Sequence, residues 1–199
     1  QTTPLQLCQM TAQLANGGFK IYPKIVVDEN SKTAEEIRII INENRKELNK
    51  EKSGLQETNE LLEFLNKKEH KPLFKNSKNI RLVLEAMFAS TNEVRGTSYS
   101  SRIEDPKYQF AGKTGTSQVR RITKAARELD LTTSEIPYTE RDHALYIAFG
   151  PYKNPRYALS IVIEHGGSGS STAAPIAKKL FKLIIDRHEL REKNKIQKD

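Results

Sequence analysis

Apolar residues recur at the spacing of an α-helix in three stretches of the chain, separated by polar and glycine-rich segments. The first stretch begins at Thr3-Pro4, which is typical of a helix N-cap followed by the first helical residue, and it stops at Asn16-Gly17-Gly18. Ser77 precedes the second stretch, and we expect it to be the N-cap there. The charged tail after Leu190 is expected to fray. The three predicted helices are residues 4–15, 79–90 and 172–188.

Short β-rich stretches lie between these helices. Residues 143–150 and 156–164 are two predicted strands, and the prolines and asparagine of residues 151–155 predict a hairpin turn between them. The two strands should therefore be antiparallel neighbours. Residues 108–119 are predicted to form another strand. Residues 19–27 are also β-rich but contain a proline, so an edge strand or an extended connection is expected there.

Residues 28–75 differ from the rest of the chain, because they are rich in Lys, Glu and Asn and poor in aromatic residues. Two runs of apolar residues at helical spacing flank Ser53-Gly54, which predicts a helical hairpin inserted into the domain. Such a hairpin is either a solvated excursion or a surface for docking a partner. Residues 120–142 are charged and must lead the chain back to the sheet, with a short helix expected near Ala125-Ala126.

Composition narrows the function classes. The chain has 199 residues, of which 36% are hydrophobic, and a formal net charge of +8. Basic and acidic residues alternate and no nucleic-acid motif occurs, so nucleic-acid binding is not predicted. The four histidines are not spaced as metal ligands, and the single Cys8 excludes an internal disulfide. There is no signal peptide and no apolar run long enough to span a bilayer, so any membrane anchor is expected outside these residues.

The candidate chemistry lies in residues 110–118, with the sequence Phe-Ala-Gly-Lys-Thr-Gly-Thr-Ser-Gln. Lys113 and three hydroxyl residues fall within five positions. Gly112 and Gly115, on either side of Lys113, allow close approach of another molecule to the backbone. The segment therefore suits an anionic ligand that bears a carboxylate. A phosphate-binding P-loop would need a glycine where Lys107 stands, so that alternative fails. Lys-Thr-Gly is instead typical of serine acyl-transferases that act on penicillins and D-Ala-D-Ala peptides.

Four blocks in the same order, together with the opening of the chain, resemble the C-terminal part of class B penicillin-binding proteins, and the likeness is closest to the penicillin-binding protein 2 group of rod-shaped bacteria. Residues 28–75 lie outside the resemblance. The matching segments are Thr3–Gln6, Ala111–Gln118, Arg141–Pro151, Ile163–Gly167 and Ala173–Pro175.

The resemblance implies an α+β fold of the β-lactamase/transpeptidase type, with a mostly antiparallel five-stranded sheet flanked by helices. It also implies a D,D-transpeptidase, in which a serine forms an acyl-enzyme with a stem peptide and a neighbouring amine takes the acyl group. The implied ligands are D-Ala-D-Ala stem peptides and β-lactams, the implied partner is a membrane glycosyltransferase, and no cofactor or metal is implied. The implied location is the periplasmic face of the bacterial inner membrane.

The resemblance also implies roles for individual residues. Lys113 and the hydroxyl of Thr116 would bind the ligand carboxylate, and the backbone N–H of Thr116 would lie in the oxyanion hole. Thr114 and Gly115 complete the expected substrate-binding segment. The period of a strand puts Thr114 and Thr116 on one face and Lys113 on the other, so a twist or bulge near Gly115 is expected. His143 is expected to be structural, because no serine is arranged beside it.

The family's nucleophile motif, Ser-x-x-Lys, does not occur in these residues. Ser77-Lys78-Asn79 spells the family's Ser-x-Asn motif, but it coincides with the start of a predicted helix. We therefore expect residues 1–199 to be the C-terminal part of a transpeptidase domain, inactive alone, with residues 28–75 inserted in it. Two alternatives remain, namely a non-catalytic peptide- or peptidoglycan-binding module and a basic interaction domain that uses the Lys-rich hairpin.

Overall fold

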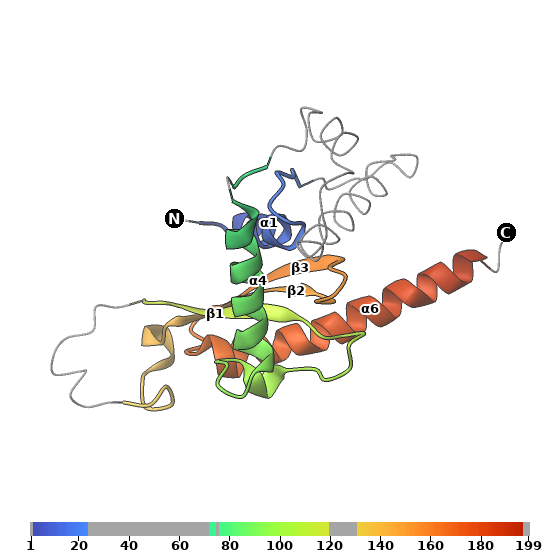
Figure 1. The fold of residues 1–199 in the computed structure, drawn as a ribbon. Coiled ribbons are helices and arrows are strands. Elements are labelled where there is room, and N and C mark those ends of the chain that lie inside the picture. The colour runs from blue at the N-terminus through green and yellow to red at the C-terminus, as the bar shows by residue number, and fades with distance from the viewer. Residues whose placement is uncertain (1, 24–71, 75, 120–130, 197–199) are drawn as a thin grey trace.

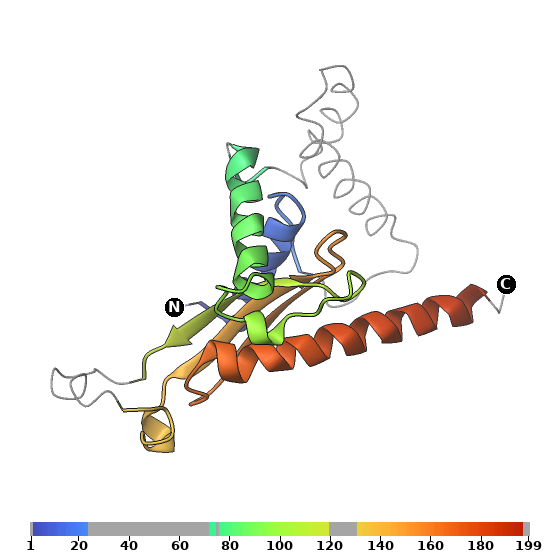
Figure 2. The ribbon, with the colours of Figure 1, turned by 60° about the horizontal axis from the view of Figure 1, so that its bottom comes forward.

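Helices cover both faces of a central antiparallel sheet. Helices α1 (Pro4–Ala15) and α4 (Ser77–Asn92) lie on one face, and α6 (Ala174–Ile196) runs along the other, as Figures 1 and 2 show from two directions. This arrangement confirms the predicted α+β class. The structure is a computed structural model, and it describes residues 2–23, 72–74, 76–119 and 131–196.

Three strands form the sheet in the described residues, against the five that the resemblance implies for a complete domain. They are β1 (Ala111–Ser117), β2 (His143–Gly150) and β3 (Tyr157–Ile163), in the order β1-β2-β3 with antiparallel pairing throughout. The hairpin of β2 and β3 is as predicted. β1 is shorter than the predicted 108–119, because the N–H groups of the two residues at 108 and 109 both donate to the carbonyl of Asp105 in a turn.

The first helix begins as the sequence predicts. The hydroxyl of Thr3 accepts a hydrogen bond from the Gln6 N–H at 3.2 Å, and the Gln6 side chain accepts one from the Thr3 N–H at 2.8 Å, which makes a capping box. Pro4 occupies the first helical position. At the other end, the Asn16 side chain accepts hydrogen bonds from the N–H groups of Gly18 and Phe19 and so closes the helix.

Helix α4 begins two residues before the predicted 79, and its cap lies one residue before the predicted Ser77. Its N-cap is Asn76, whose side-chain oxygen accepts from the Lys78 N–H at 2.9 Å, so the prediction of Ser77 as the cap was wrong. Both residue types cap helices well, and only the backbone conformation distinguishes them. The helix ends at Asn92, and its side chain donates to the carbonyl of Phe110 at 2.9 Å, which ties the helix end to the start of β1.

The C-terminal helix is longer than predicted. A five-residue π-helical turn, η3 (Gly169–Ala173), leads into α6, which continues to Ile196. The expected fraying after Leu190 is therefore wrong for the described part of the tail. The residues there are mostly strong helix formers. Glu189 also forms an ion pair with Lys107 of the loop before β1, at 2.8 Å.

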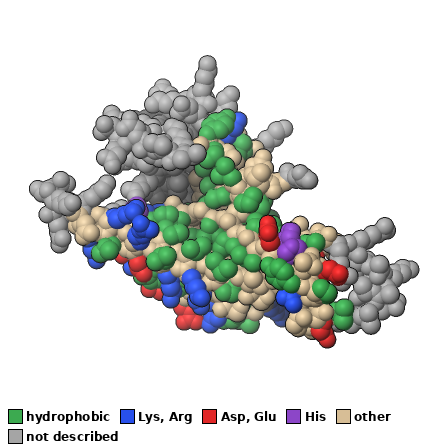
Figure 3. All heavy atoms as spheres, turned by 180° about the vertical axis from the view of Figure 1, so that it is seen from behind, with side chains coloured by type: hydrophobic (Ala, Val, Ile, Leu, Met, Phe, Trp, Pro, Cys, Tyr) green, Lys and Arg blue, Asp and Glu red, His purple; other side chains and the backbone are tan. Residues whose placement is uncertain are grey.

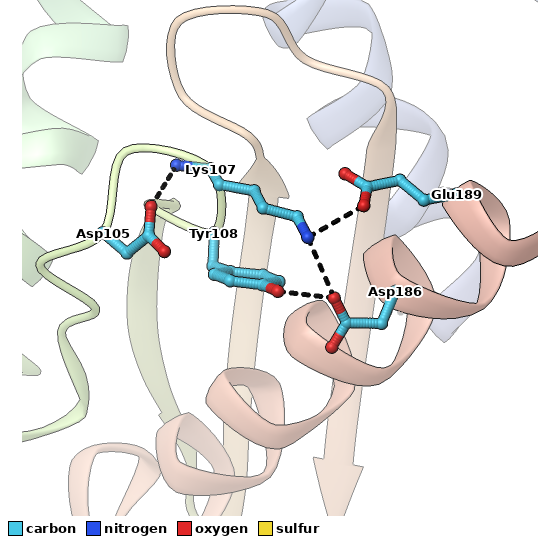
Figure 4. A network of polar contacts seen from close by, with 5 residues as sticks. All are labelled: Asp105, Lys107, Tyr108, Asp186 and Glu189. Atoms are coloured by element: carbon cyan, nitrogen blue, oxygen red, sulfur yellow. Dashed lines mark hydrogen bonds and ion pairs between the residues drawn. The ribbon is translucent and has the colours of Figure 1, made fainter.

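That ion pair belongs to a polar cluster between the loop and α6 (Figure 4). The Lys107 ammonium contacts Asp186 at 3.2 Å and Glu189 at 2.8 Å, and the Tyr108 hydroxyl donates to Asp186 at 2.5 Å. The hydrogen bond from Tyr108, and then that from Lys107, lowers the pKa of Asp186. Asp105 accepts from the Lys107 N–H and shapes the turn. The cluster fixes the approach of the chain to β1.

Two hydrophobic clusters flank the sheet. One lies between the sheet and α6, where Phe110 stacks on Phe181 with ring centroids 4.9 Å apart. The other joins Ala111 and Phe149 of the sheet to Ala15 of α1 and Met87 of α4. Because Ala111 faces α1 and α4, the strand period places Lys113 and Gly115 on that face too.

Some predictions lie partly or wholly outside the described residues. Residues 19–23 form no regular strand, and Phe19 makes a single bridge to Pro72, so this part is an extended connection. Apart from residues 72–74, the inserted hairpin predicted for 28–75 lies outside the described residues. The short helix predicted near Ala125-Ala126 lies outside them as well.

Candidate functional site

The Lys-Thr-Gly segment forms β1, which is the edge strand among the described residues. The Gly112 N–H donates to the hydroxyl of Thr91, on α4, at 3.0 Å, so it points away from β2. Alternate residues of an antiparallel strand direct their backbone groups the same way. The N–H groups of Thr114 and Thr116 therefore lie along the same outer edge as that of Gly112.

The pairing of β1 with β2 has no bulge. Seven residues pair one to one, from Ala111 with Phe149 to Ser117 with His143. Of the two features expected near Gly115, a bulge is therefore absent, and the lysine side chain itself brings its ammonium to the outer edge. The Lys113 ammonium donates to the carbonyl of Thr114 at 2.8 Å and lies 3.4 Å from the Thr114 hydroxyl. The flexible four-carbon stem lets the charge reach around the strand.

The exposed end of this strand carries the remaining candidate groups. Lys113 and Thr116 are exposed, and Thr114 and Gly115 are partly buried. An added Cβ at Gly115 would meet one protein atom within 4 Å, the Leu145 Cβ at 3.3 Å, so a side chain there would need a shift of only a few tenths of an ångström. The structure thus brings a cation, a hydroxyl and outward-facing N–H groups together along one edge, which is the donor set that binds a carboxylate.

Gly112 has a different role from the one its place in the motif suggested. A Cβ there would lie 2.4 Å from the hydroxyl oxygen of Tyr146 and 2.5 Å from its ring. Tyr146 is fully buried and cannot yield the space. The glycine therefore makes room for a core tyrosine behind the strand, and not for a ligand in front of it.

Sequence reasoning missed a buried group of hydroxyls behind the site. The Tyr146 hydroxyl lies 2.9 Å from both the Thr91 and the Ser98 hydroxyls, and Ser98 also donates to the Ser90 carbonyl at 3.0 Å. The side chains of Thr91, Ser98 and Tyr146 are fully buried. Burial raises the pKa of Tyr146, against the opposing effect of its two hydrogen bonds. No local pattern marks these residues, which are up to 55 positions apart.

His143 has the contacts of a structural histidine. Its Nδ1 accepts a hydrogen bond from the His165 N–H at 3.0 Å, and the two rings meet edge to face at 4.9 Å. The His165 Nδ1 faces the Arg141 carbonyl at 3.1 Å, so this nitrogen carries a proton. The pair joins the end of β3 to the start of β2.

The glycine-rich segment 166–169 forms a tight connection from β3 to η3. The N–H groups of Gly166, Gly167 and Ser168 donate to backbone carbonyls of the protein. A Cβ at Gly169 would lie 2.4 Å from the Leu145 carbonyl oxygen, so the turn packs directly on the sheet.

Among the described residues, no group of three His, Cys, Asp or Glu side chains could hold a metal ion. No helix in the same part of the chain is long and apolar enough to cross a membrane.

Comparison with known protein families identifies the family of this chain. The model described as the penicillin binding protein transpeptidase domain matches residues 1–182. The chain belongs to this family. Within it, the chain is 40% identical to the peptidoglycan D,D-transpeptidase MrdA of Salmonella typhimurium over 105 residues, which are 53% of this chain and 16% of that protein. It is 33% identical to the MrdA of Escherichia coli K12 over 113 residues, which are 57% of this chain and 16% of that protein.

Solved structures of this transpeptidase family share the fold. The penicillin-binding protein PBP2 of Helicobacter pylori, solved in complex with MreC, superposes with a TM-score of 0.58 at 24% identity, over 95% of this chain and 25% of that one. PBP2 of Pseudomonas aeruginosa, in complex with WCK 5153, gives 0.51 at 27% identity, over 89% and 28%. The chain is thus a PBP2-like transpeptidase family member that spans 16% of the length of the MrdA relatives.

Proposed function

We propose that this chain is part of a serine D,D-transpeptidase that cross-links peptidoglycan stem peptides, and that the outer edge of β1 binds the terminal carboxylate of D-Ala-D-Ala or of a β-lactam. The observation that carries the proposal is the Lys113 ammonium, which rests on the outer edge 2.8 Å from the Thr114 carbonyl. There it lies on the same edge as the Thr116 N–H. A ligand carboxylate would add to this ammonium or displace the carbonyl from it.

Each candidate residue then has a distinct task. Lys113 supplies the charge, and the Thr116 hydroxyl supplies a second donor to the carboxylate. The Thr116 N–H, directed outward, stabilises the oxyanion that forms when a serine attacks the scissile carbonyl. Gly115 leaves the strand open beside it. Thr114 belongs to the same substrate-binding segment, and its carbonyl and hydroxyl hold the Lys113 ammonium there.

The reaction needs groups that these residues do not supply. A serine hydroxyl attacks the carbonyl of the penultimate D-alanine, the terminal D-alanine leaves with a proton, and an amine of a second stem peptide then displaces the serine. The serine and its general-base lysine would come from a Ser-x-x-Lys motif elsewhere in a longer protein. A periplasmic location, a membrane glycosyltransferase partner and inhibition by β-lactams go with that longer protein and are proposed with it.

Labelling with a fluorescent penicillin tests the proposal. A longer protein that carries both this chain and a Ser-x-x-Lys motif should be labelled, and its Lys113→Ala variant should be labelled much more slowly. Residues 1–199 alone should form no covalent adduct. A stoichiometric acyl mass shift on the 199 residues, or equal labelling of the Lys113→Ala variant, would contradict the proposal.

The two alternatives predict different results. A non-catalytic carboxylate-binding module would lack Ser-x-x-Lys in its complete coding sequence and would bind D-Ala-D-Ala peptides reversibly. A basic interaction domain would bind polyanions with a steep dependence on salt. Basic and acidic side chains are interleaved along the lower edge of the face in Figure 3, so the described residues form no continuous basic patch there. The Lys-rich residues that this alternative invokes lie almost entirely outside the described residues, so the salt dependence of binding is its test.

A further inference from the structure

The segment between α4 and the loop before β1 crosses the outer edge of β1 beside the proposed carboxylate site. We propose that Thr97, in this segment, is a positioning residue that orients the Lys113 ammonium through the hydroxyl of Thr114. The inference rests on the proposed function of the β1 edge. It assigns a role to a residue outside the Lys-Thr-Gly motif and outside the segments that carry the family resemblance.

A line of hydroxyls connects α4 to the ammonium. The Ser90 hydroxyl lies 3.1 Å from that of Thr97, which lies 3.3 Å from that of Thr114. The Thr114 hydroxyl is in turn 3.4 Å from the Lys113 Nζ. Thr97 thus comes into contact with Thr114 from a segment 17 residues away in sequence.

The chemistry of the groups gives this line a direction. An ammonium can only donate, so the Thr114 hydroxyl accepts from Lys113. Its single proton is then available for Thr97, whose own proton is available for Ser90. Hydrogen bonds in such a sequence polarise one another, and the end of the line at Thr114 becomes a better acceptor. The line therefore holds the ammonium on the outer edge, where a ligand carboxylate would meet it.

Thr97 itself is fixed by its neighbours. A Cβ at Gly96 would lie 2.4 Å from the Ser90 carbonyl oxygen and 2.5 Å from that of Ala89, so the backbone passes close over the end of α4. On the other side, the Ser98 N–H and hydroxyl both donate to the Ser90 carbonyl at 3.0 Å. An exposed threonine held between two such anchors has a defined position at little entropic cost. The position of its hydroxyl is thereby set by the end of α4 and by the buried Ser98.

The test compares β-lactam acylation by the longer protein and its variants. Benzylpenicillin carries the carboxylate, and its methyl ester does not, so the ratio of their acylation efficiencies reports recognition of that group. Thr97→Val, which keeps the shape but removes the hydroxyl, should lower this ratio by about 3- to 10-fold, the net effect of one hydrogen bond. Thr97→Ser should stay within about twofold of the parent. Thr97→Ala serves as a second hydroxyl-free variant if the valine variant unfolds at a lower temperature.

A double-mutant cycle separates positioning from general support. If Thr97 acts through Thr114, then Thr97→Val should change the ratio little in a Thr114→Val background. An unchanged ratio in both Thr97→Val and Thr97→Ala, or a full effect of Thr97→Val without the Thr114 hydroxyl, would overturn the inference. Lys113→Ala provides the distinguishing control. If Lys113→Ala leaves the ratio of acylation efficiencies unchanged, the proposed function is wrong. If Lys113→Ala lowers the ratio and the Thr97 variants do not, only the role of Thr97 is refuted.

Discussion

Gly112 and Lys113 are neighbours on β1, yet they lie in environments of opposite kind. Gly112 adjoins a fully buried set of hydroxyls from Thr91, Ser98 and Tyr146, in which every donor and acceptor has a partner inside the protein. Lys113 is exposed, and its ammonium contacts only Thr114 among the described groups. Buried polar networks are costly to disturb, whereas exposed contacts contribute little to stability.

This contrast separates two tasks on one strand. We expect substitutions in the buried half to lower stability and substitutions in the exposed half to lower activity, each with little effect on the other property. The two halves meet at Thr114, whose hydroxyl contacts Thr97 on one side and lies close to Lys113 on the other. The strand can therefore present charged and polar groups to a ligand without using them to hold the fold together.

The largest effect is expected for Lys113→Ala. Removing one member of a charge-assisted pair costs about 2 to 4 kcal/mol, so acylation efficiency should fall by about 10²- to 10³-fold. The melting temperature should barely change, because an exposed lysine contributes little packing. Lys113→Arg should be only partly tolerated, since the guanidinium is larger. Stopped-flow acylation of the longer protein by a chromogenic β-lactam measures both variants, and a change below about threefold for Lys113→Ala would refute the site assignment.

Gly112→Ala should have the opposite profile. The new Cβ would lie 2.4 Å from the Tyr146 hydroxyl oxygen, and the buried ring has no space to move into. Overpacking of this kind costs about 1 to 3 kcal/mol. Denaturant unfolding should show the loss. Gly115→Ala is the matched control on the same strand, because its nearest neighbour would be 3.3 Å away, and it should lower stability less. Equal losses at the two glycines would show that the contrast between the halves is wrong.

The sequence predicted the local features of this strand and missed the features that depend on distant contacts. Thr3 and Pro4 predicted the start of α1, because a cap and its helix are neighbours in the chain. The motif around Lys113 was found because its spacing is itself the signal. The bulge expected near Gly115 was wrong, since alternation describes where a side chain leaves the backbone and not where a flexible lysine ends.

The buried hydroxyls show why the remainder could not be predicted. Thr91 and Tyr146 are 55 residues apart, and each alone is an ordinary residue of a helix or a strand. Only the packing of α4 on β1 brings them together. Thr97 was missed for the same reason. The ion pair of Lys107 with Glu189 on α6 likewise joins residues that are distant in the chain.

Tyr146→Phe should cost less than overpacking at Gly112, because the ring is kept. Thr91 and Ser98 retain other hydrogen-bond partners, so a loss of about 0.5 to 1.5 kcal/mol is expected, with acylation unchanged within about twofold.

The pH dependence of the unfolding free energy gives a second test of Tyr146. Since burial raises the pKa of Tyr146 above its ordinary value of 10.0, its contribution is complete below pH 10.0 and is lost as the pH rises toward the pKa of the folded state. The phenylalanine variant should lack this alkaline loss, and chemical unfolding between pH 8 and about 11 would detect it.

The smallest effect is expected at Asp186, where α6 meets the loop that leads into β1 (Figure 4). Its contacts with Tyr108 and Lys107 are as numerous as those of the Tyr146 hydroxyl, but they are exposed to solvent, which screens them. The hydrogen bond from Tyr108 lowers the pKa of Asp186, so its contribution is present above the ordinary pKa of 3.8 and is lost as the pH falls through the lower value of the folded state. Asp186→Asn should therefore lower the melting temperature slightly at pH 7, by no more than a few degrees, and the difference from the parent should vanish in acid. Glu104→Gln, in the exposed pair with Arg102, is the control for a surface charge away from α6. If Asp186→Asn destabilised the protein as much as Gly112→Ala, then the number of contacts, and not their burial, would decide which residues hold the strand in place.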